Sequence, residues 1–337
     1  MRILILGGTG VISRAIVDQL LARGDDVTLY NRGRNPLPFS TEVRELNGDR
    51  SDRAAFETEM QQHSFDVVID MICFNEAEAR STVRAFKGRA GQVIVTSSVA
   101  AYKRPYKTIP TIEAAEELWD DPAFPYAFHK AEMERYLWEA SGRGDIPLTI
   151  IRPSLTFGIG AMNVGVLRQN YGIVDRIIKA KPLVMFGDGK TPWSFTFTPD
   201  LARGYVALAG NPKAIGEAFH VTSEFRNYWE DLYLEFGKIV GKKPRIVHIP
   251  SEILFKAAPG LGNHLYFEKT YPGLFDNSKI KAIAPEYEAA INLEEGVRLL
   301  YDWFVESGRV VDPVKDALED RLVEERQKFE EAVVGLF

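Results

Sequence analysis

The sequence predicts an α/β protein with a doubly wound parallel sheet and a smaller, mostly helical C-terminal lobe. Three observations lead to this fold class. The chain opens with an uninterrupted apolar run at residues 3–6, a glycine turn at Gly7 and Gly10, and then a helical pattern of apolar residues. Further short apolar runs follow up to residue 153, separated by turns and helical segments. Beyond about residue 160 the pattern changes to short strands and several helices.

The order strand, glycine turn, helix predicts a Rossmann-type dinucleotide site. The run at residues 3–6 suits a strand that is buried on both faces of a parallel sheet. Gly7 permits the tight turn, and Gly10 lets the backbone approach a pyrophosphate at the helix N-terminus. Ser13 stands where a third glycine is usual, and its side chain is small enough for close packing of helix on strand.

Composition gives a soluble cytoplasmic protein as the default expectation. The 337 residues include 45% hydrophobic and 26% charged residues, and the net charge of −6 gives no reason to expect nucleic acid or anionic membranes as partners. Cys73 is the single cysteine, which excludes an intrachain disulfide and indicates a reducing compartment. No apolar run approaches the roughly 18 residues of a membrane span. A core strand that begins by residue 3 leaves no room for a signal peptide.

The end of the second predicted strand, residues 26–31, indicates which cofactor binds. NAD-binding sites usually carry an acidic residue there for the ribose 2′-hydroxyl. This chain has Asn31, Arg32 and Arg34 instead, and arginine can bind a 2′-phosphate through paired hydrogen bonds. The sequence therefore favours NADP over NAD, although both arginines could simply be solvated.

Three more strands are predicted to complete the cofactor side of the sheet. Residues 43–46 lead to Asp49, which could accept from an adenine amino group or cap the helix that follows. Residues 65–71 end at Met71, which with Ile72 could flank the cofactor, whereas Cys73 is expected to pack in the core. Residues 92–96 deliver Ser97 and Ser98 to the carboxyl edge of the sheet, where ligands bind in open α/β folds.

A helix is predicted from residue 124 to about residue 141. Tyr126 and Lys130 are four residues apart, so they share one face of that helix. An ammonium group beside a phenol stabilises the phenolate and lowers the tyrosine pKa, which makes tyrosine a usable base near neutral pH.

The second half of the chain is expected to interleave two domains. The dinucleotide-binding domain covers residues 1–160 with returning segments near 190–223, and residues 161–337 form mainly the substrate-binding lobe. Residues 312–337 carry one apolar stripe that is expected to pack on its own domain. The remaining predicted elements are a strand at 147–153, a helix at 165–180, strands at 184–186, 195–198 and 219–222, a helix from Thr198, and helices at 228–240, 251–258 and 293–306.

The chain resembles the extended short-chain dehydrogenases/reductases, the NAD(P)-dependent epimerase/dehydratase family. The resemblance runs from residue 2 to about 222, and more loosely to 304. The motifs that carry it are Gly7-Gly8-Thr9-Gly10, Gly48-Asp49, Thr96-Ser97-Ser98 with Tyr102, Tyr126-x-x-x-Lys130, Arg152-Pro153, and Asp188-Gly189 with Asp200-Leu201-Ala202.

The resemblance implies roles for three residues. Tyr126 would exchange a proton with the substrate oxygen, and Lys130 would hold the nicotinamide ribose. The hydroxyl four residues before the strand-exit tyrosine orients the same oxygen, and this position is Ser98, with Ser97 and Thr96 as alternatives. The cofactor contacts expected from the motifs and the strand ends are Gly7, Thr9, Gly10, Val11, Ile12, Asn31, Arg32, Arg34, Asp49, Arg50, Met71, Tyr126, Lys130 and Pro153.

Two departures from the family pattern restrict the substrate. Family 4,6-dehydratases carry an acidic pair after the strand-end hydroxyl, whereas Val99 and Ala100 follow Ser98 here, so that dehydration is disfavoured. Nucleotide-sugar epimerases usually carry an arginine five residues after the Asp of Asp-Gly, and this position is Trp193. Trp193 could line a pocket or lie in the core, and Lys190 or Arg168 could replace the missing arginine.

The function expected is an epimerase-like NAD(P)-dependent oxidoreductase acting on a sugar-like hydroxylated substrate. An NADPH-dependent carbonyl reductase or dehydrogenase is the alternative that Arg32 and Arg34 favour. A non-catalytic dinucleotide sensor or an RNA-associated protein is the alternative of another class. A homodimer is expected only from the resemblance. No metal site is expected, since the five histidines are dispersed without ligand spacing.

Overall fold

The computed structural model describes residues 1–34, 37–39, 43–161 and 163–336. They divide into two compact units, each assembled from three stretches of chain. The first unit contains Met1–Thr156, Thr196–Glu224 and Phe275–Ala290, and the second contains Phe157–Phe195, Phe225–Leu274 and Ile291–Phe337. The short strands β7 (Leu155–Phe157) and β10 (Phe195–Phe197) lie where the chain passes between the units.

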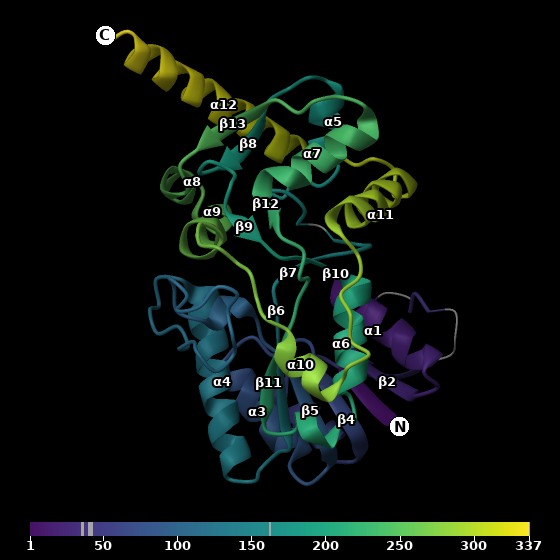
Figure 1. Cartoon of the computed structure of the whole chain (residues 1–337). Helices are drawn as coiled ribbons and strands as arrows, with labels where there is room; N and C mark the ends of the chain where they lie inside the picture. Colours follow the sequence, from purple (N-terminus) through teal and green to yellow (C-terminus); the bar gives the residue numbers. More distant parts are fainter. Residues whose placement is uncertain (35–36, 40–42, 162, 337) are drawn as a thin grey trace. The chain divides into compact units, whose positions relative to one another are not determined.

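The first unit is built on a parallel seven-stranded sheet in the order β11-β6-β5-β4-β1-β2-β3 (Figure 1). The strand order reverses at β1, which pairs with β2 on one side and with β4 on the other. This is the topological switch point at which doubly wound sheets bind ligands. The strands are β1 (Arg2–Leu6), β2 (Asp26–Asn31), β3 (Arg44–Asn47), β4 (Phe65–Asp70), β5 (Ala90–Thr96), β6 (Leu148–Pro153) and β11 (Glu217–Val221).

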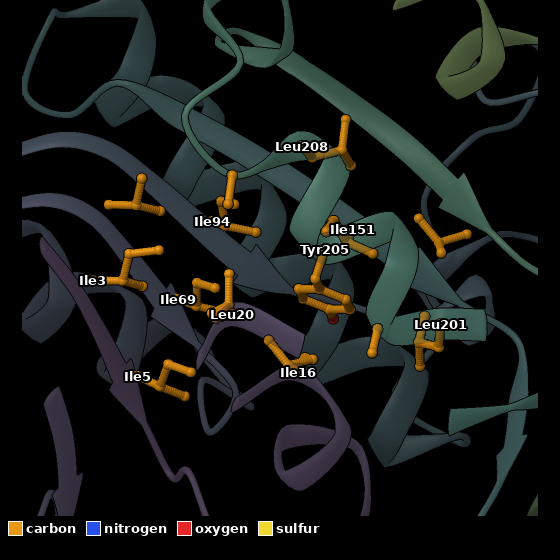
Figure 2. Packing of buried hydrophobic residues seen from close by; sticks show 14 of the residues in the cluster. Ile3, Ile5, Ile16, Leu20, Ile69, Ile94, Ile151, Leu201, Tyr205 and Leu208 are labelled. Atoms are coloured by element: carbon orange, nitrogen blue, oxygen red, sulfur yellow. The ribbon is translucent and has the colours of Figure 1, made fainter. Parts of the chain in front are cut away.

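Helices cover both faces of this sheet because its central strands are apolar on both sides. In β1, Ile3 and Ile5 belong to one core cluster, whereas Leu4 and Leu6 belong to the other. Figure 2 shows the first cluster, in which strand isoleucines meet side chains of α1 and α6. This face carries α1 (Val11–Ala22), α6 (Thr198–Leu208) and α10 (Ser278–Ile283), and the other carries α2 (Arg53–Met60), α3 (Glu76–Phe86) and α4 (Pro125–Gly142).

The second unit is mostly helical. Its strands form two small pairs, β8 (Leu183–Phe186) with β13 (Ile246–Ile249) and β9 (Pro192–Trp193) with β12 (Asn227–Tyr228). Within the described ranges, no helix is both long enough and apolar enough to span a membrane. The helices are α5 (Gly172–Ile178), α7 (Trp229–Val240), α8 (Ser251–Ala257), α9 (Pro259–His264), α11 (Leu293–Glu306) and α12 (Pro313–Val334), and a π-helical turn covers Leu265–Lys269.

The helix predicted over residues 165–180 is wrong in its first half, because the helix begins only at Gly172. Arg168 and Asn170 adopt left-handed backbone conformations, with φ of 57° and 55°. The Asn170 side chain accepts a hydrogen bond from the Val164 amide (3.0 Å). A side chain that binds the backbone in this way competes with helix formation, and periodicity alone does not reveal it.

The apolar stripe predicted on the C-terminal tail is also partly wrong. The tail is helical, but Val314 is 74% exposed and Phe329 is 62% exposed. The residues that α12 buries are Glu319 and Val323, on a different face. Glu319 is buried because its carboxylate accepts a hydrogen bond inside the second unit, from the Val184 amide (2.7 Å).

Candidate active site

The glycine turn between β1 and α1 is closed by Ser13. Gly7 has a φ of +83°, and a Cβ there would lie 2.6 Å from Ile72 Cγ2. The Ser13 hydroxyl donates to the Gly7 carbonyl (2.7 Å), and the Gly10 amide donates to Ser13 Oγ (2.9 Å). Serine in place of the third glycine therefore fixes the turn at the N-terminus of α1.

A cavity of about 420 Å³ opens beside this turn. Eight of the residues predicted to bind the cofactor lie on its wall, whereas Val11, Ile12, Met71, Tyr126, Lys130 and Pro153 do not. Tyr30, Phe74 and Glu78 lie on the wall without having been predicted, although Phe74 lies only four residues beyond the end of β4. The wall consists of Gly7, Thr9, Gly10, Tyr30, Asn31, Arg32, Gly33, Arg34, Gly48, Asp49, Arg50, Ser51, Ile72, Phe74 and Glu78.

The polar groups at the end of β2 fit a dinucleotide. The Asn31 side chain accepts from the Gly8 amide (3.1 Å), and its buried Nδ2 has no hydrogen-bond partner among the described residues. Arg32 and Arg34 are exposed, and neither forms an ion pair with a residue that the structure describes. The Ser51 hydroxyl and amide, together with the charges of both arginines, hold the pKa of Asp49 below its ordinary value. These groups can hold an adenosine and a phosphate at this end of the cavity.

Arg50 lies on the cavity wall, where its buried Nε and Nη1 have no hydrogen-bond partner among the described residues, whereas its Nη2 binds into the protein. Its Nη2 lies 2.9 Å from a carboxylate oxygen of the buried Asp70 and donates to Thr82 Oγ1 (2.6 Å). The guanidinium group also lies over the ring of Phe56, 4.9 Å from its centroid. Arg50 therefore ties the segment after β3 to β4 and α3.

Lys130 is buried on the first turns of α4 and binds two carbonyl groups at the sheet edge. Its ammonium donates to the Cys73 carbonyl and to the Thr96 carbonyl, both at 2.7 Å. The ring of Phe74 lies 4.8 Å from the same nitrogen and connects it with the cavity wall. Burial lowers the pKa of Lys130. An ammonium has three N–H groups, so the two bonds that it makes to described residues leave the third available for a ligand.

Tyr126 lies one turn before Lys130, at the start of α4. Its side chain is 37% exposed, whereas Lys130 is 2% exposed. Burial and then the neighbouring Tyr126 raise the pKa of Tyr205, whose hydroxyl donates to Thr96 Oγ1 (2.9 Å). Tyr126 is therefore the more accessible of the two side chains, whereas Lys130 is anchored at the carboxyl end of β5.

Ser98 is one of three hydroxyl residues at the carboxyl end of β5, and it is less buried than Thr96 and Ser97. It caps a short 3-10 helix, η1 (Val99–Ala101), by accepting from the Ala100 amide (3.1 Å). Its hydroxyl proton is not used in that bond. Thr96 Oγ1 is engaged by Tyr205 and Met71, and Ser97 is 2% exposed.

Cys73 and Trp193 are core residues. Burial raises the pKa of the Cys73 thiol, so that it stays protonated at neutral pH. Trp193 is fully buried in the second unit against Trp229, with ring centroids 5.7 Å apart. Lys190, one candidate for the missing arginine, is paired with Glu230.

The sequence is similar to those of several known proteins. A model of the NAD dependent epimerase/dehydratase family matches residues 3–222. The 2'-dehydrokanamycin reductase of Streptomyces kanamyceticus is 26% identical over 314 residues, which cover 93% of this chain and 87% of that protein. The chloroplast stem-loop binding protein of 41 kDa b of Arabidopsis thaliana is 28% identical over 284 residues, covering 79% of this chain and 71% of that protein.

The fold also occurs in solved structures. The UDP-glucuronic acid 4-epimerase of Bacillus cereus in complex with NAD superposes with a TM-score of 0.72 at 20% identity. The superposition covers 92% of this chain and 98% of that chain. At this identity the likeness shows that the two chains share a fold.

Proposed function

The chain belongs to the NAD dependent epimerase/dehydratase family, and on this premise we propose that Ser98, Tyr126 and Lys130 perform hydride-transfer chemistry on a sugar-like substrate. It is an NAD(P)-dependent, epimerase-like oxidoreductase. The observation that carries the proposal is the anchoring of Lys130. Its buried ammonium binds the Cys73 carbonyl after β4 and the Thr96 carbonyl at the end of β5, while Tyr126 stays accessible one turn away.

The three side chains divide the proton chemistry between them. The nicotinamide ring, when bound, accepts or donates the hydride. Tyr126 takes the proton of a substrate hydroxyl during oxidation and returns it to the carbonyl oxygen during reduction. The Lys130 ammonium stabilises the phenolate, and the free proton of Ser98 makes a hydrogen bond to the same substrate oxygen.

The cofactor proposed is NADP. The support is the pair of exposed arginines, Arg32 and Arg34, at the position where NAD-binding sites usually carry an acidic residue. Two guanidinium groups that form no ion pair within the described part of the chain are suited to a 2′-phosphate, which carries about two negative charges. Asp49, on the same wall, is suited to the adenine amino group.

Net reduction of a ketone is the second version of the reaction. An epimerase reoxidises its cofactor within one turnover, whereas a reductase exchanges it with solution. The reductase is favoured by the proposed preference for NADPH and by the similarity to 2'-dehydrokanamycin reductase. It is also favoured by the buried Trp193, which stands where nucleotide-sugar epimerases usually carry an arginine. The similarity to sugar epimerases favours the internal cycle.

The first test is to denature the purified protein and identify any released dinucleotide by mass spectrometry, and then to titrate the emptied protein with NADPH and NADH. We expect tighter binding of NADPH. Arg32→Ala and Arg34→Ala should each weaken NADPH binding by about 10- to 150-fold, because each removes a charge-assisted hydrogen bond. NADH binding should be unchanged. Arg89→Ala, an exposed arginine at the amino end of β5, is the control for general charge effects. Tightly retained NAD, or equal losses for both cofactors, would contradict the assignment.

The second test measures hydride transfer. 2′-Dehydrokanamycin with NADPH probes reduction, and UDP-glucuronate with NAD probes epimerisation, as suggested by the relatives. Tyr126→Phe should abolish turnover and leave cofactor binding intact, since the phenol oxygen serves the proton transfer. Turnover that survives this change would refute the role of Tyr126.

A role in binding RNA is the candidate of another class, and the similarity to the stem-loop binding protein favours it. The net charge of −6 opposes it, since RNA affinity comes largely from phosphate neutralisation. A mobility-shift titration with a stem-loop RNA distinguishes the two. Tight binding that is unaffected by Tyr126→Phe would favour the RNA role.

A further inference from the structure

Ser98 caps η1, whereas Tyr126 and Lys130 lie on α4, and a buried chain of hydrogen bonds joins these two elements. We propose that Tyr102 and His220 are positioning residues, which hold the turn that carries Ser98 in a fixed place relative to the helix that carries Tyr126 and Lys130. This inference rests on the proposed function for the roles of those three residues. The chain runs from Glu134 through Arg152 and Tyr102 to His220.

The first link ties α4 to the sheet. Glu134 follows Lys130 by four residues and Tyr126 by eight, so the three share one side of the helix. Its carboxylate accepts from Arg152 Nε (2.9 Å) and from Arg152 Nη2, and Arg152 belongs to β6. Glu134 is fully buried and Arg152 is 5% exposed. Separating a buried ion pair would leave each charge without a partner and would destabilise the folded protein. The two side chains are therefore held in one geometry.

The second link ties the sheet to the turn of Ser98. Arg152 Nη1 donates to the Tyr102 hydroxyl (2.8 Å), and Tyr102 is fully buried. Tyr102 closes η1, since its amide donates to the Val99 carbonyl (3.3 Å). The opposite end of the same short helix is capped by Ser98. The position of the Tyr102 ring therefore sets the position of the residue four places earlier.

The third link fixes the direction of the hydrogen bonds. Because Arg152 donates to the Tyr102 oxygen, the Tyr102 proton is free to go to His220 Nε2, which lies 2.8 Å away. His220 must then be neutral and carry its proton on Nδ1, which lies 3.2 Å from the Asp276 carbonyl. His220 also lies opposite Arg152 in the register of β11 and β6.

The charged groups around His220 keep it neutral. Burial and the Arg152 charge lower its pKa to about 3. Arg152 faces it from β6 and Lys279 from α10. Glu113, whose own pKa is raised by burial, accepts from the His220 amide (2.7 Å). His220 therefore remains a hydrogen-bond acceptor for Tyr102 across the pH range of an enzyme assay.

The test compares variants that each remove or keep one polar group of this chain of hydrogen bonds. Tyr102→Phe removes the central hydroxyl and keeps the ring. His220→Gln keeps an acceptor near Nε2, whereas His220→Asn keeps a polar group near Nδ1 and leaves the Tyr102 proton without an acceptor. Tyr287→Phe is the matched control, a buried tyrosine of the same unit whose hydroxyl donates to Thr222 at 3.4 Å.

Two readouts decide the proposal. The first is hydrogen exchange of peptides 97–104 and 125–134, which needs no substrate. The second is kcat with whichever probe, 2′-dehydrokanamycin or UDP-glucuronate, the wild-type protein turns over, measured together with the NADPH dissociation constant. Tyr102→Phe and His220→Asn should exchange faster in both peptides and lower kcat by about 10- to 100-fold with unchanged NADPH affinity, because small misplacements of reacting groups are costly. His220→Gln and Tyr287→Phe should resemble the wild type.

Failure of this inference and failure of the proposed function give different results. If the wild type turns over neither probe, the proposed function fails, and the exchange rates still decide the positioning role. If Tyr102→Phe leaves both exchange and kcat unchanged, or if His220→Asn is as active as His220→Gln, the positioning role is refuted. A loss of NADPH affinity equal to the loss in kcat would assign the chain a general structural role, and would also refute it.

Discussion

Replacing Glu134 with glutamine should destabilise the first unit strongly, because it leaves the Arg152 charge buried without a counter-ion. Glu134 is fully buried, and Arg152 is 5% exposed. The carboxylate holds the guanidinium by hydrogen bonds from both Nε and Nη2. Glutamine keeps the size of the side chain, so packing is nearly unchanged, and the variant isolates the charge.

The expected loss is about 3–5 kcal/mol, the range found when one partner of a buried ion pair is removed. The Tyr102 hydroxyl also accepts from Arg152, and a neutral hydroxyl compensates only part of the charge. Against a total stability of about 5–15 kcal/mol for a typical domain, this loss is large. The matched control is Glu57→Gln, which removes the same charge from the more exposed pair with Arg84 and should cost about 0–1 kcal/mol.

Urea unfolding followed by circular dichroism measures both variants. The double variant Glu134→Met with Arg152→Met should recover part of the loss, because neither charge is then left alone. Equal midpoints for Glu134→Gln and Glu57→Gln would refute the reasoning. A double variant less stable than Glu134→Gln would show that packing, not charge, sets the cost.

Two further predictions concern the second unit and the glycine turn. Burial raises the pKa of Glu319 from 4.5 to about 7, so the stabilisation from its protonated form is complete below pH 4.5 and is lost as the pH rises through 7. Glu319→Gln should therefore match the wild type in urea unfolding near pH 4.5 and exceed its free energy of unfolding by up to about 3 kcal/mol at pH 8. A difference that stays constant with pH would contradict this prediction. Gly7→Ala should cost about 1–3 kcal/mol and abolish cofactor binding in the titration, because of its φ of +83° and the contact with Ile72. Gly88→Ala, with a φ of +69° and open space around it, should keep cofactor binding, and equal binding by both variants would argue against the turn as the cofactor site.

The sequence was sufficient where the determining contacts are local. The succession of β1, the turn at Gly7 and α1 follows from an apolar run, a flexible residue and a helical repeat within about 20 residues. The shared face of Tyr126 and Lys130 follows from helix geometry alone. The fold class and the family therefore follow from motifs whose order along the chain is fixed.

Tertiary structure decided what depends on residues distant in the sequence. Lys130 is anchored by the carbonyl groups of Cys73 and Thr96, and backbone carbonyls leave no trace in a sequence motif. The burial of Trp193 and the pairing of Arg152 with Glu134 also depend on packing partners that periodicity does not identify. The close packing of the core decides which side chains become neighbours when they are distant in the sequence. The sequence therefore determined which groups carry the chemistry, and only the structure decided what holds them in place.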